Sequence, residues 1–355
     1  MRALRVARVE RQVGGVRFEG TLADARRANL ELRTAVRVLW RLARFTAVDT
    51  DALYEGASSV DWSRFLGPDG SLRVDAQSSE SALEHTLFVE QRVKDAVVDQ
   101  LRAKHGRRPA VDKERPDLPV HVHLFRDRCT LSVDTSGDSL HLRGWRTFQG
   151  RAPLAETLAA GLVLASGWDR RAPLIDPFCG SGTILIEAAL IASGLAPGLF
   201  RERFAFERWP GHDAKRWTAE REAARARVKK PAKLTLLGYD ADRGAIAGAR
   251  ANAESAGVAD LLQFEPARAE QFAPKRGWNA WIVTNPPYGE RIGGEGDLVE
   301  LHARLGALLR DACRGYRVSL LSGNARLVRA LGIEPSASFE LKNGGLDCTV
   351  SSFVL

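Results

Sequence analysis

Residues 174–188 read LIDPFCGSGTILIEA. An apolar strand, a turn of small residues and an amphipathic helix predict a site for a nucleotide-like ligand, because Gly180 and Gly182 let the backbone approach a ligand where a Cβ would clash. The turn is neither the dinucleotide pattern G-x-G-x-x-G nor a P-loop. Asp176 at the strand end would repel a phosphate but suits an ammonium, which points to S-adenosylmethionine (SAM) rather than NAD or ATP. An ordinary turn of an α/β protein is the open alternative.

A second motif follows about a hundred residues later, where residues 281–291 read WIVTNPPYGER. Open α/β sheets bind ligands at the carboxyl ends of their strands, so both loops should face one crevice. Pro286 and Pro287 stiffen the turn. The Asn285 side chain and the backbone carbonyls of Asn285 and Pro286 can accept hydrogen bonds from an exocyclic amine, and Tyr288 offers a flat face to a flipped base. The two motifs together resemble those of SAM-dependent methyltransferases of adenine N6 or guanine N2.

The composition indicates a basic protein with more than one domain. The chain has 355 residues, a net charge of +8 and an isoelectric point of about 9.6, and its length favours two or three domains. The charge is uneven: residues 1–44 carry +7 and residues 201–233 carry +6. Such patches suit a polyanion. A solvated, arginine-rich surface is the alternative.

The sequence favours a cytoplasmic protein without a metal or a membrane anchor. No apolar run reaches the roughly 18 residues of a membrane span, and the N-terminus shows no apolar signal-peptide region. His121 and His123 alternate on one predicted strand without a nearby Cys or acidic partner, so we expect surface histidines. The cysteines are far apart, without a Cys-x-x-Cys pair, which disfavours zinc and disulfides: Cys129, Cys179, Cys313 and Cys348.

The front half alternates strand and helix patterns in a small basic unit. Thr21 is placed to cap the first helix, and Pro109 must end the longest one. The expected elements are a strand at 14–20, a helix at 22–32, a strand at 34–48 with Val36, Val38, Trp40 and Leu42 on one side, a helix at 50–58, a strand at 71–77, a helix at 80–105 and strands at 119–126 and 130–135.

The back half alternates strands and helices around the two motifs. Asp240 ends the second strand, where an acid can bond ribose hydroxyls, and Asp242 fits an N-cap. Residues 195–233 are too long for an ordinary connection and predict an insertion. The segment 140–146 should either touch nucleic acid or brace the linker. The expected elements are a helix at 152–166, strands at 174, 234–239, 261–265 and 279–284, helices at 243–256 and 297–313, a strand at 317–322, a short helix, and a hairpin of 337–341 with 346–354 around an Asn-Gly turn.

With these motifs in place, the chain resembles the bacterial THUMP-domain RNA guanine-N2 methyltransferases over essentially all of its length. Besides the two loop motifs, the segments that carry the resemblance are 15–20, 28–35, 132–137, 140–145 and 152–160. The resemblance implies a class I SAM-methyltransferase domain, which is Rossmann-like with a seven-stranded sheet and a terminal antiparallel hairpin. An α+β ferredoxin-like and THUMP region would precede it.

The resemblance also implies domain limits and roles for individual residues. We expect a ferredoxin-like region at 1–58, shortened at its start, an RNA-binding THUMP domain at 59–150 and the methyltransferase domain at 151–355. Glu270 or Gln271 would replace the acid that reads the SAM adenine. The residues implied to bind SAM are Asp176, Phe178, Gly180, Gly182, Thr183 and Asp240, and those implied to hold the target guanine are Asn285, Pro286, Pro287 and Tyr288.

The implied activity is methyl transfer from SAM to the N2 amine of a guanine in RNA, with 23S rRNA as the first choice of substrate. Catalysis would rest on positioning, without a metal or a covalent nucleophile. The alternatives are a tRNA guanine-N2 enzyme, an adenine-N6 enzyme acting on nucleic acid, and a non-catalytic RNA-binding assembly factor. The sequence carries no indication of the oligomeric state.

Overall fold

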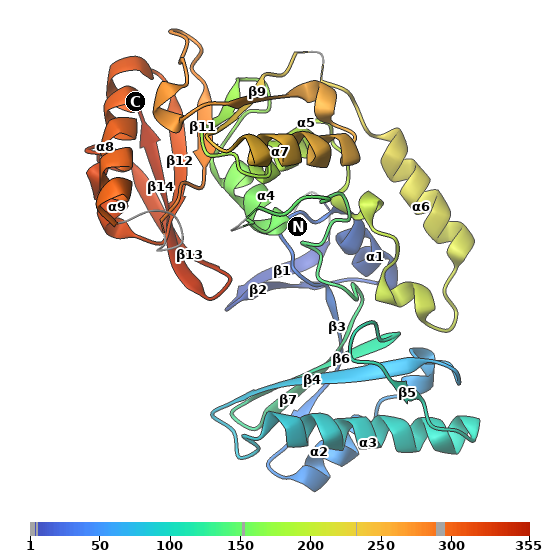
Figure 1. Cartoon of the computed structure of the whole chain (residues 1–355). Helices are drawn as coiled ribbons and strands as arrows, with labels where there is room; N and C mark the ends of the chain where they lie inside the picture. The colour runs from blue at the N-terminus through green and yellow to red at the C-terminus, as the bar shows by residue number, and fades with distance from the viewer. Residues whose placement is uncertain (1–3, 5, 151–152, 232, 289–294) are drawn as a thin grey trace. The chain divides into compact units, whose positions relative to one another are not determined.

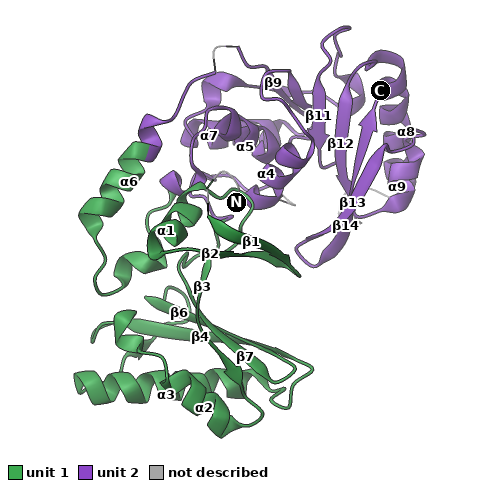
Figure 2. Ribbon diagram, turned by 180° about the vertical axis from the view of Figure 1, so that it is seen from behind, with its two compact units in different colours: residues 1–140, 201–223 green, residues 141–200, 224–355 purple. Residues whose placement is uncertain are grey.

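A computed structural model of the chain shows two compact units (Figures 1 and 2). Unit 1 comprises residues 1–140 and 201–223, and unit 2 comprises residues 141–200 and 224–355. The described residues are 4, 6–150, 153–231, 233–288 and 295–355.

Unit 1 begins with a hairpin where the sequence predicted one strand. β1 (Ala7–Gln12) pairs with β2 (Gly15–Glu19), and every residue of β1 is exposed, so no apolar alternation marks this strand in the sequence. α1 (Leu22–Glu31) follows, and Thr21 caps it as predicted. The Thr21 hydroxyl accepts the Asp24 N–H, and the Asp24 carboxylate accepts the Thr21 N–H at 2.8 Å, which is a capping box.

The main sheet of unit 1 has the order β3-β7-β6-β4-β5 among the described residues. Two helices, α2 and α3, pack on one of its faces (Figure 1). Val120, Val122 and Leu124 are buried, whereas His121 and His123 lie on the opposite face. His123 is exposed as predicted, but His121 is only partly exposed and lies beside an acid. The elements are β3 (Leu39–Thr46), α2 (Thr50–Ser58), a 3-10 turn (Trp62–Arg64), β4 (Ser71–Ser79), α3 (Thr86–His105), β5 (Ala110–Val111), β6 (Leu118–Phe125) and β7 (Arg128–Asp134).

The strand predicted from residue 34 begins only at Leu39. The residues before it bond to the chain that follows β7, since the Thr135 N–H donates to the Val38 carbonyl at 3.0 Å and the Leu140 N–H donates to the Val36 carbonyl at 2.8 Å. Val36, expected on the same side of the strand as Val38, is exposed, whereas Val38 is buried. These contacts are non-local, so the alternating pattern of the sequence alone overestimated the strand.

The helix predicted over residues 80–105 begins at Thr86. The chain before it makes a turn, in which the Ala82 N–H donates to the Asp127 carboxylate at 2.7 Å. Leu87, in the first turn of α3, is exposed. The residues before Thr86 therefore belong to a turn that the Asp127 side chain holds.

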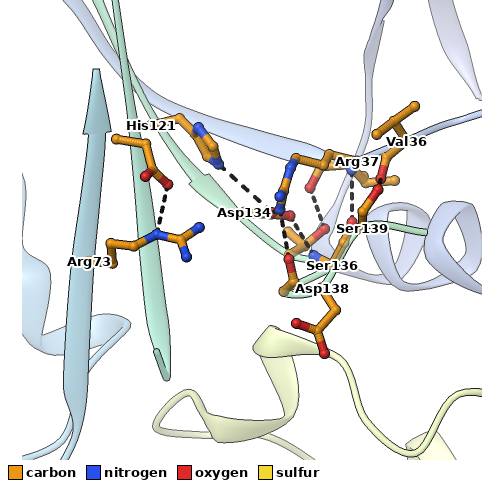
Figure 3. A network of polar contacts seen from close by, with 12 residues as sticks. Val36, Arg37, Arg73, His121, Asp134, Ser136, Asp138 and Ser139 are labelled. Carbon is orange, nitrogen blue, oxygen red and sulfur yellow. Dashed lines mark hydrogen bonds and ion pairs between the residues drawn. The ribbon is translucent and has the colours of Figure 1, made fainter. Parts of the chain in front are cut away.

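One buried carboxylate holds two neighbouring segments at one edge of the sheet in unit 1. Asp134 is fully buried and forms an ion pair with Arg37, and Figure 3 shows Arg37 and His121 pointing toward it. The Ser136 N–H donates to Asp134 Oδ1 at 2.8 Å, and His121 Nε2 lies 3.8 Å from Oδ2. Asp134 therefore fixes the chain before β3 against the end of β7.

The predicted insertion contributes residues 201–223 to unit 1. The rings of Phe206 and Trp217 meet edge to face, with centroids 5.0 Å apart. Arg26 on α1 makes a bidentate ion pair with Glu220, at 3.1 and 3.2 Å. The helical elements of the whole connection are 3-10 turns at Pro197–Phe200 and Ala205–Arg208 and the helix α6 (Ala214–Ala226).

Unit 2 confirms the predicted fold class. Its described residues form a seven-stranded sheet in the order β10-β9-β8-β11-β12-β14-β13, in which the last two strands make the predicted antiparallel hairpin. The remaining neighbours are parallel. The strands are β8 (Leu174–Asp176), β9 (Leu236–Asp240), β10 (Leu262–Pro266), β11 (Trp281–Thr284), β12 (Arg317–Ser322), β13 (Ala337–Asn343) and β14 (Leu346–Val354).

Helices cover both faces of this sheet, so its core has two halves. α4, α5 and α7 enclose one buried cluster, and α8 with the end of α9 encloses the other. Among the described residues, no helix combines the length and the apolar content needed to cross a membrane. The helical elements are α4 (Glu156–Ala165), α5 (Thr183–Ala192), α7 (Arg243–Ser255), α8 (Glu295–Ala312), α9 (Ala325–Ala330), and 3-10 turns at Ala259–Leu261 and Ala269–Gln271.

Candidate active site

The two loop motifs lie at adjacent strand ends of the sheet in unit 2. β8 lies between β9 and β11 and is parallel to both, with Ile175 opposite Leu237 on one side and Ile282 on the other. The chain order runs from β8 through β9 to β10 in one direction, and from β11 to β12 in the other. β8 is therefore at a topological switch point, which is where open α/β sheets bind their ligands.

A hydrogen bond joins the two motifs directly. The Thr284 hydroxyl donates to Asp176 Oδ1 at 2.7 Å, and the Phe178 N–H donates to the same oxygen at 3.1 Å. Asp176 is 1% exposed, and this burial raises its pKa to about 7, with the negative charge of Asp240 adding to the rise. The motif thus contains a buried acid that titrates near neutrality and would gain from a cationic partner.

Asp240 holds the glycine turn from the neighbouring strand. Its Oδ2 accepts the Gly180 N–H at 3.0 Å, and its Oδ1 accepts the Asp242 N–H at 2.9 Å. Each carboxylate oxygen has room for a second donor. Asp242 caps α7 as predicted, because its carboxylate accepts the Gly244 N–H at 2.7 Å.

The two glycines of the turn differ in their surroundings. Gly180 has a φ of +51°, and a Cβ there would meet no described atom within 4 Å. Gly182 has a φ of +80°, and a Cβ there would lie 2.9 Å from the Phe264 ring and 3.1 Å from Ala249. Gly180 therefore borders open space, as close approach of a ligand requires, whereas Gly182 is needed for packing. The open space beside Gly180 and the buried acid Asp176 fit SAM.

Arg146 supports this turn, and the sequence analysis did not identify it. Its guanidinium donates to the hydroxyls of Ser181 at 3.2 Å and Thr183 at 3.1 Å. It also donates to the Leu154 carbonyl and to the Glu156 carboxylate, both at 2.8 Å. The Thr183 hydroxyl, expected at the cofactor, thus already has a protein partner.

Asn252 holds the same segment from α7. It is fully buried, and its amide group donates to the carbonyls of Ser181 and Phe148, each at 3.0 Å. Its side-chain oxygen accepts the N–H groups of Thr147 and Phe148 at 2.8 and 2.9 Å. The only signal in the sequence is a polar residue at an apolar position of the predicted helix.

The segment 140–146 braces the linker, which decides between the two possibilities that the sequence left open. Arg143 is 2% exposed, and its Nε lies 3.2 Å from the buried Glu187 carboxylate on α5. Trp145 is also buried. Side chains so enclosed are unavailable to a nucleic acid in this structure.

The second motif presents an unsatisfied acceptor. Asn285 Oδ1 is buried and has no hydrogen-bond partner among the described residues. Pro286 is buried and Pro287 is partly exposed. Because a buried polar group without a partner costs free energy, an acceptor of this kind indicates a ligand that donates a hydrogen bond.

Tyr288 is held by the terminal hairpin. Its hydroxyl accepts a hydrogen bond from the Asn343 amide at 2.9 Å and lies 3.8 Å from the Cys348 sulfur. A Cβ at Gly323 would lie 3.1 Å from the Tyr288 ring, and burial raises the pKa of the phenol. The end of the motif, Gly289–Arg291, lies outside the described residues.

Glu270, one of the two residues expected to read the SAM adenine, already has one partner in the protein. Glu270 Oε1 lies 3.5 Å from Arg304 Nε, and Glu270 Oε2 is buried without a partner in the described part of the chain. Gln271 follows it in the same 3-10 turn, and Phe272 is buried. Over the described ranges, no group of three or more His, Cys, Asp or Glu side chains is placed to hold a metal ion.

The fold and the site define a class I SAM-dependent methyltransferase. The RMKL-like methyltransferase domain matches residues 143–352, and the chain belongs to this family. The THUMP domain matches residues 47–134, and the RlmL ferredoxin-like domain matches residues 1–39.

Individual relatives agree with this family. A Methylococcus capsulatus (Bath) protein named Ribosomal RNA large subunit methyltransferase K/L is 45% identical over 348 residues, which are 96% of this chain and 47% of that protein. The chain thus spans about half the length of the curated relatives that it matches.

Two solved structures are similar over nearly the whole chain. SMU.472 complexed with SAH has a TM-score of 0.90 at 29% identity and covers 99% of this chain and 93% of its own. A Listeria monocytogenes str. 4b F2365 structure, described as a predicted N6-adenine-specific DNA methylase, has a TM-score of 0.88 at 32% identity and covers 97% and 89%.

We predict that Arg146→Ala weakens SAM binding at least about tenfold, because the glycine turn loses its hydrogen bonds to a buried guanidinium. Isothermal titration calorimetry measures the SAM Kd, and circular dichroism checks folding. Arg314→Ala, which removes an exposed arginine of the same unit, is the control. A folded Arg146→Ala variant with the wild-type SAM Kd would contradict this role.

Proposed function

We propose that this chain transfers a methyl group from SAM to the exocyclic N2 amine of a guanine in RNA, and that its substrate is 23S rRNA. The observation that carries the proposal is the buried, unpartnered Oδ1 of Asn285. It follows Thr284, whose hydroxyl bonds the Asp176 carboxylate of the cofactor motif. The names of the relatives support rRNA as the substrate, and the THUMP match supports RNA.

The proposed chemistry depends on orientation of a weak nucleophile. The guanine amine is weak because its lone pair is delocalised into the ring. Asn285 Oδ1 and the Pro286 carbonyl would accept its two N–H groups and direct the lone pair at the methyl carbon, while Tyr288 would hold the base. SAM, when bound, supplies an electrophilic methyl group; the new C–N bond replaces the C–S bond, and the amine loses a proton. Such positioning can contribute up to roughly 7–11 kcal/mol.

We assign the cofactor contacts to the first motif. Asp176 would pair with the ammonium of SAM, and Asp240 would accept hydrogen bonds from the ribose hydroxyls. Gly180 would admit the cofactor to the turn. Phe178 would line the same pocket. Gly182 and Thr183 would act mainly by shaping the turn, since one packs against Phe264 and the other bonds Arg146.

The front of the chain would supply RNA recognition in a cytoplasmic enzyme. In this proposal residues 1–58 are ferredoxin-like, residues 59–150 form the THUMP domain, and residues 151–355 carry the chemistry. Adenine-N6 methylation is the second candidate, because the same acceptors suit the adenine amine and the similar Listeria structure is described as an adenine-specific methylase. A tRNA guanine is the third.

Purified full chain, SAM, and unmodified 23S rRNA or tRNA test the proposal, with nucleosides identified by mass spectrometry after digestion. We expect N2-methylguanosine in rRNA alone. Detection of N6-methyladenosine would show that the target base is adenine instead of guanine. Methylation of tRNA alone would show that the substrate is tRNA instead of rRNA. If neither RNA is methylated, the proposed activity is contradicted.

We predict that Asn285→Ala lowers the transfer rate at least about 100-fold, because the amine loses the acceptor that orients it. The SAM Kd should stay nearly unchanged, since this residue would touch only the base. Asn285→Asp keeps an acceptor oxygen and should retain part of the activity. A parallel loss of SAM binding in Asn285→Ala would exclude the role.

We predict that SAM binding strengthens as the pH rises from about 5.5 to about 7.5, because only the ionised form of Asp176 pairs with an ammonium. Burial raises the pKa of Asp176 to about 7, so affinity should change by up to about tenfold per pH unit below that value and level off above it. Asp176→Asn should bind more weakly, with this dependence removed. Calorimetry across the pH range measures both proteins, and a flat wild-type profile contradicts the assignment.

A further inference from the structure

One face of the sheet in unit 1 carries polar and basic side chains in register across three strands, β3, β7 and β6. Strand pairing sets Arg44 opposite Thr130 and Thr130 opposite His123 in one row. In the next row Arg128 lies opposite Phe125. Directly paired residues point to the same face, and the alternate residues of these strands are buried under α2 and α3. These six residues define the open sheet face: Arg41, Arg44, His123, Phe125, Arg128 and Thr130.

A β-bulge brings two of the arginines to this face. Arg41 pairs with Ser132, and Arg44 pairs with Thr130, so three residues on β3 span two on β7. Without the extra residue, Arg44 would point toward the helices. Bulges commonly redirect a side chain in this way.

The arginines of the open sheet face are exposed and unpaired. The side chains of Arg41, Arg44 and Arg128 have no ion pair or hydrogen bond to any of the described residues. Among the described residues of this sheet, the carboxylates of Asp75 and Asp134 share this side and already have partners: Asp75 bonds Arg73 at 2.9 Å, and the buried Asp134 pairs with Arg37 (Figure 3). The face therefore has positive charge without a free acid to neutralise it.

The same face also exposes ring surface. Phe125 is 40% exposed, although it lies on a strand whose other side is core, and the Arg126 guanidinium lies 4.9 Å from its ring centroid. His123 two residues earlier is exposed as well. A duplex offers phosphates but keeps its bases stacked inside, whereas a single strand offers both phosphates and free bases. Guanidinium groups beside exposed rings on an open sheet suit the second kind of ligand.

We propose that the open sheet face binds a single-stranded segment of the RNA substrate, with phosphates on Arg41, Arg44 and Arg128 and a base stacked on Phe125. This inference rests on the proposed function only in taking RNA as the partner. It assigns recognition to a surface of unit 1 that contains no residue of the methyl-transfer site.

Fluorescence anisotropy of the full chain with a labelled single-stranded RNA of about 12 nucleotides tests the surface at several salt concentrations. Arg44→Ala combined with Arg128→Ala should raise the Kd about tenfold and flatten the slope of log Kd against log salt by about 1.4, the loss expected for two phosphate contacts on a single strand. Phe125→Leu should raise the Kd for the single strand about fivefold and leave that for a matched duplex unchanged.

The control is Arg108→Ala, which removes an exposed arginine of unit 1 outside this face and should change the Kd less than about twofold. Equal losses from Arg108→Ala and the double variant, or tighter binding of the duplex, overturn the proposal. Methyl transfer by the same proteins separates the two hypotheses. If the wild type methylates RNA and the double variant binds RNA normally, the proposed RNA-binding surface is excluded and the proposed function stands. If the wild type binds RNA through this face but transfers no methyl group, the proposed function is excluded and the RNA-binding surface stands.

Discussion

The hydrogen bond from Thr284 to Asp176 is the interaction on which the active site depends. It crosses from the end of one strand to the end of its neighbour and joins the two motifs at a buried carboxylate. Because burial raises the pKa of Asp176 to about 7, a cationic ligand at this acid would favour its ionised form. A ligand there would contact a side chain that also holds the second motif.

A second layer of side chains holds this arrangement in place. Arg146 and Asn252 bond Ser181 from different parts of the chain. Arg146 donates to the Ser181 hydroxyl, and Asn252 donates to the Ser181 carbonyl. The linker that leads into the methyltransferase unit thus helps to hold the glycine turn of the first motif. The side chains of Ser181, Thr183 and Asn252 are buried and hydrogen-bonded, which restrains the turn at the point where precise placement matters.

Local patterns predicted which loops meet at the edge of the sheet, but not the side chains, Arg146 and Asn252, that brace them. Asp176, Gly180 and Asp240 meet because strand ends of a parallel sheet share one edge, a rule that needs only the order of strands. Arg146 reaches Ser181 across 35 residues, and Asn252 reaches it across 71, so no short pattern marks either contact. The late starts of β3 and α3 have the same origin, since partners distant in sequence bind the residues before them.

The shared insertion has a consequence for how the protein is made. Unit 1 takes residues 201–223 from beyond the cofactor motif, and the Phe206–Trp217 contact and the Arg26–Glu220 pair both depend on them. A ribosome that has released only residues 1–140 has therefore not yet supplied all of unit 1. The first part of unit 2, with α4, β8 and α5, is therefore synthesised before the last part of unit 1, so unit 1 cannot be completed before synthesis of unit 2 has begun.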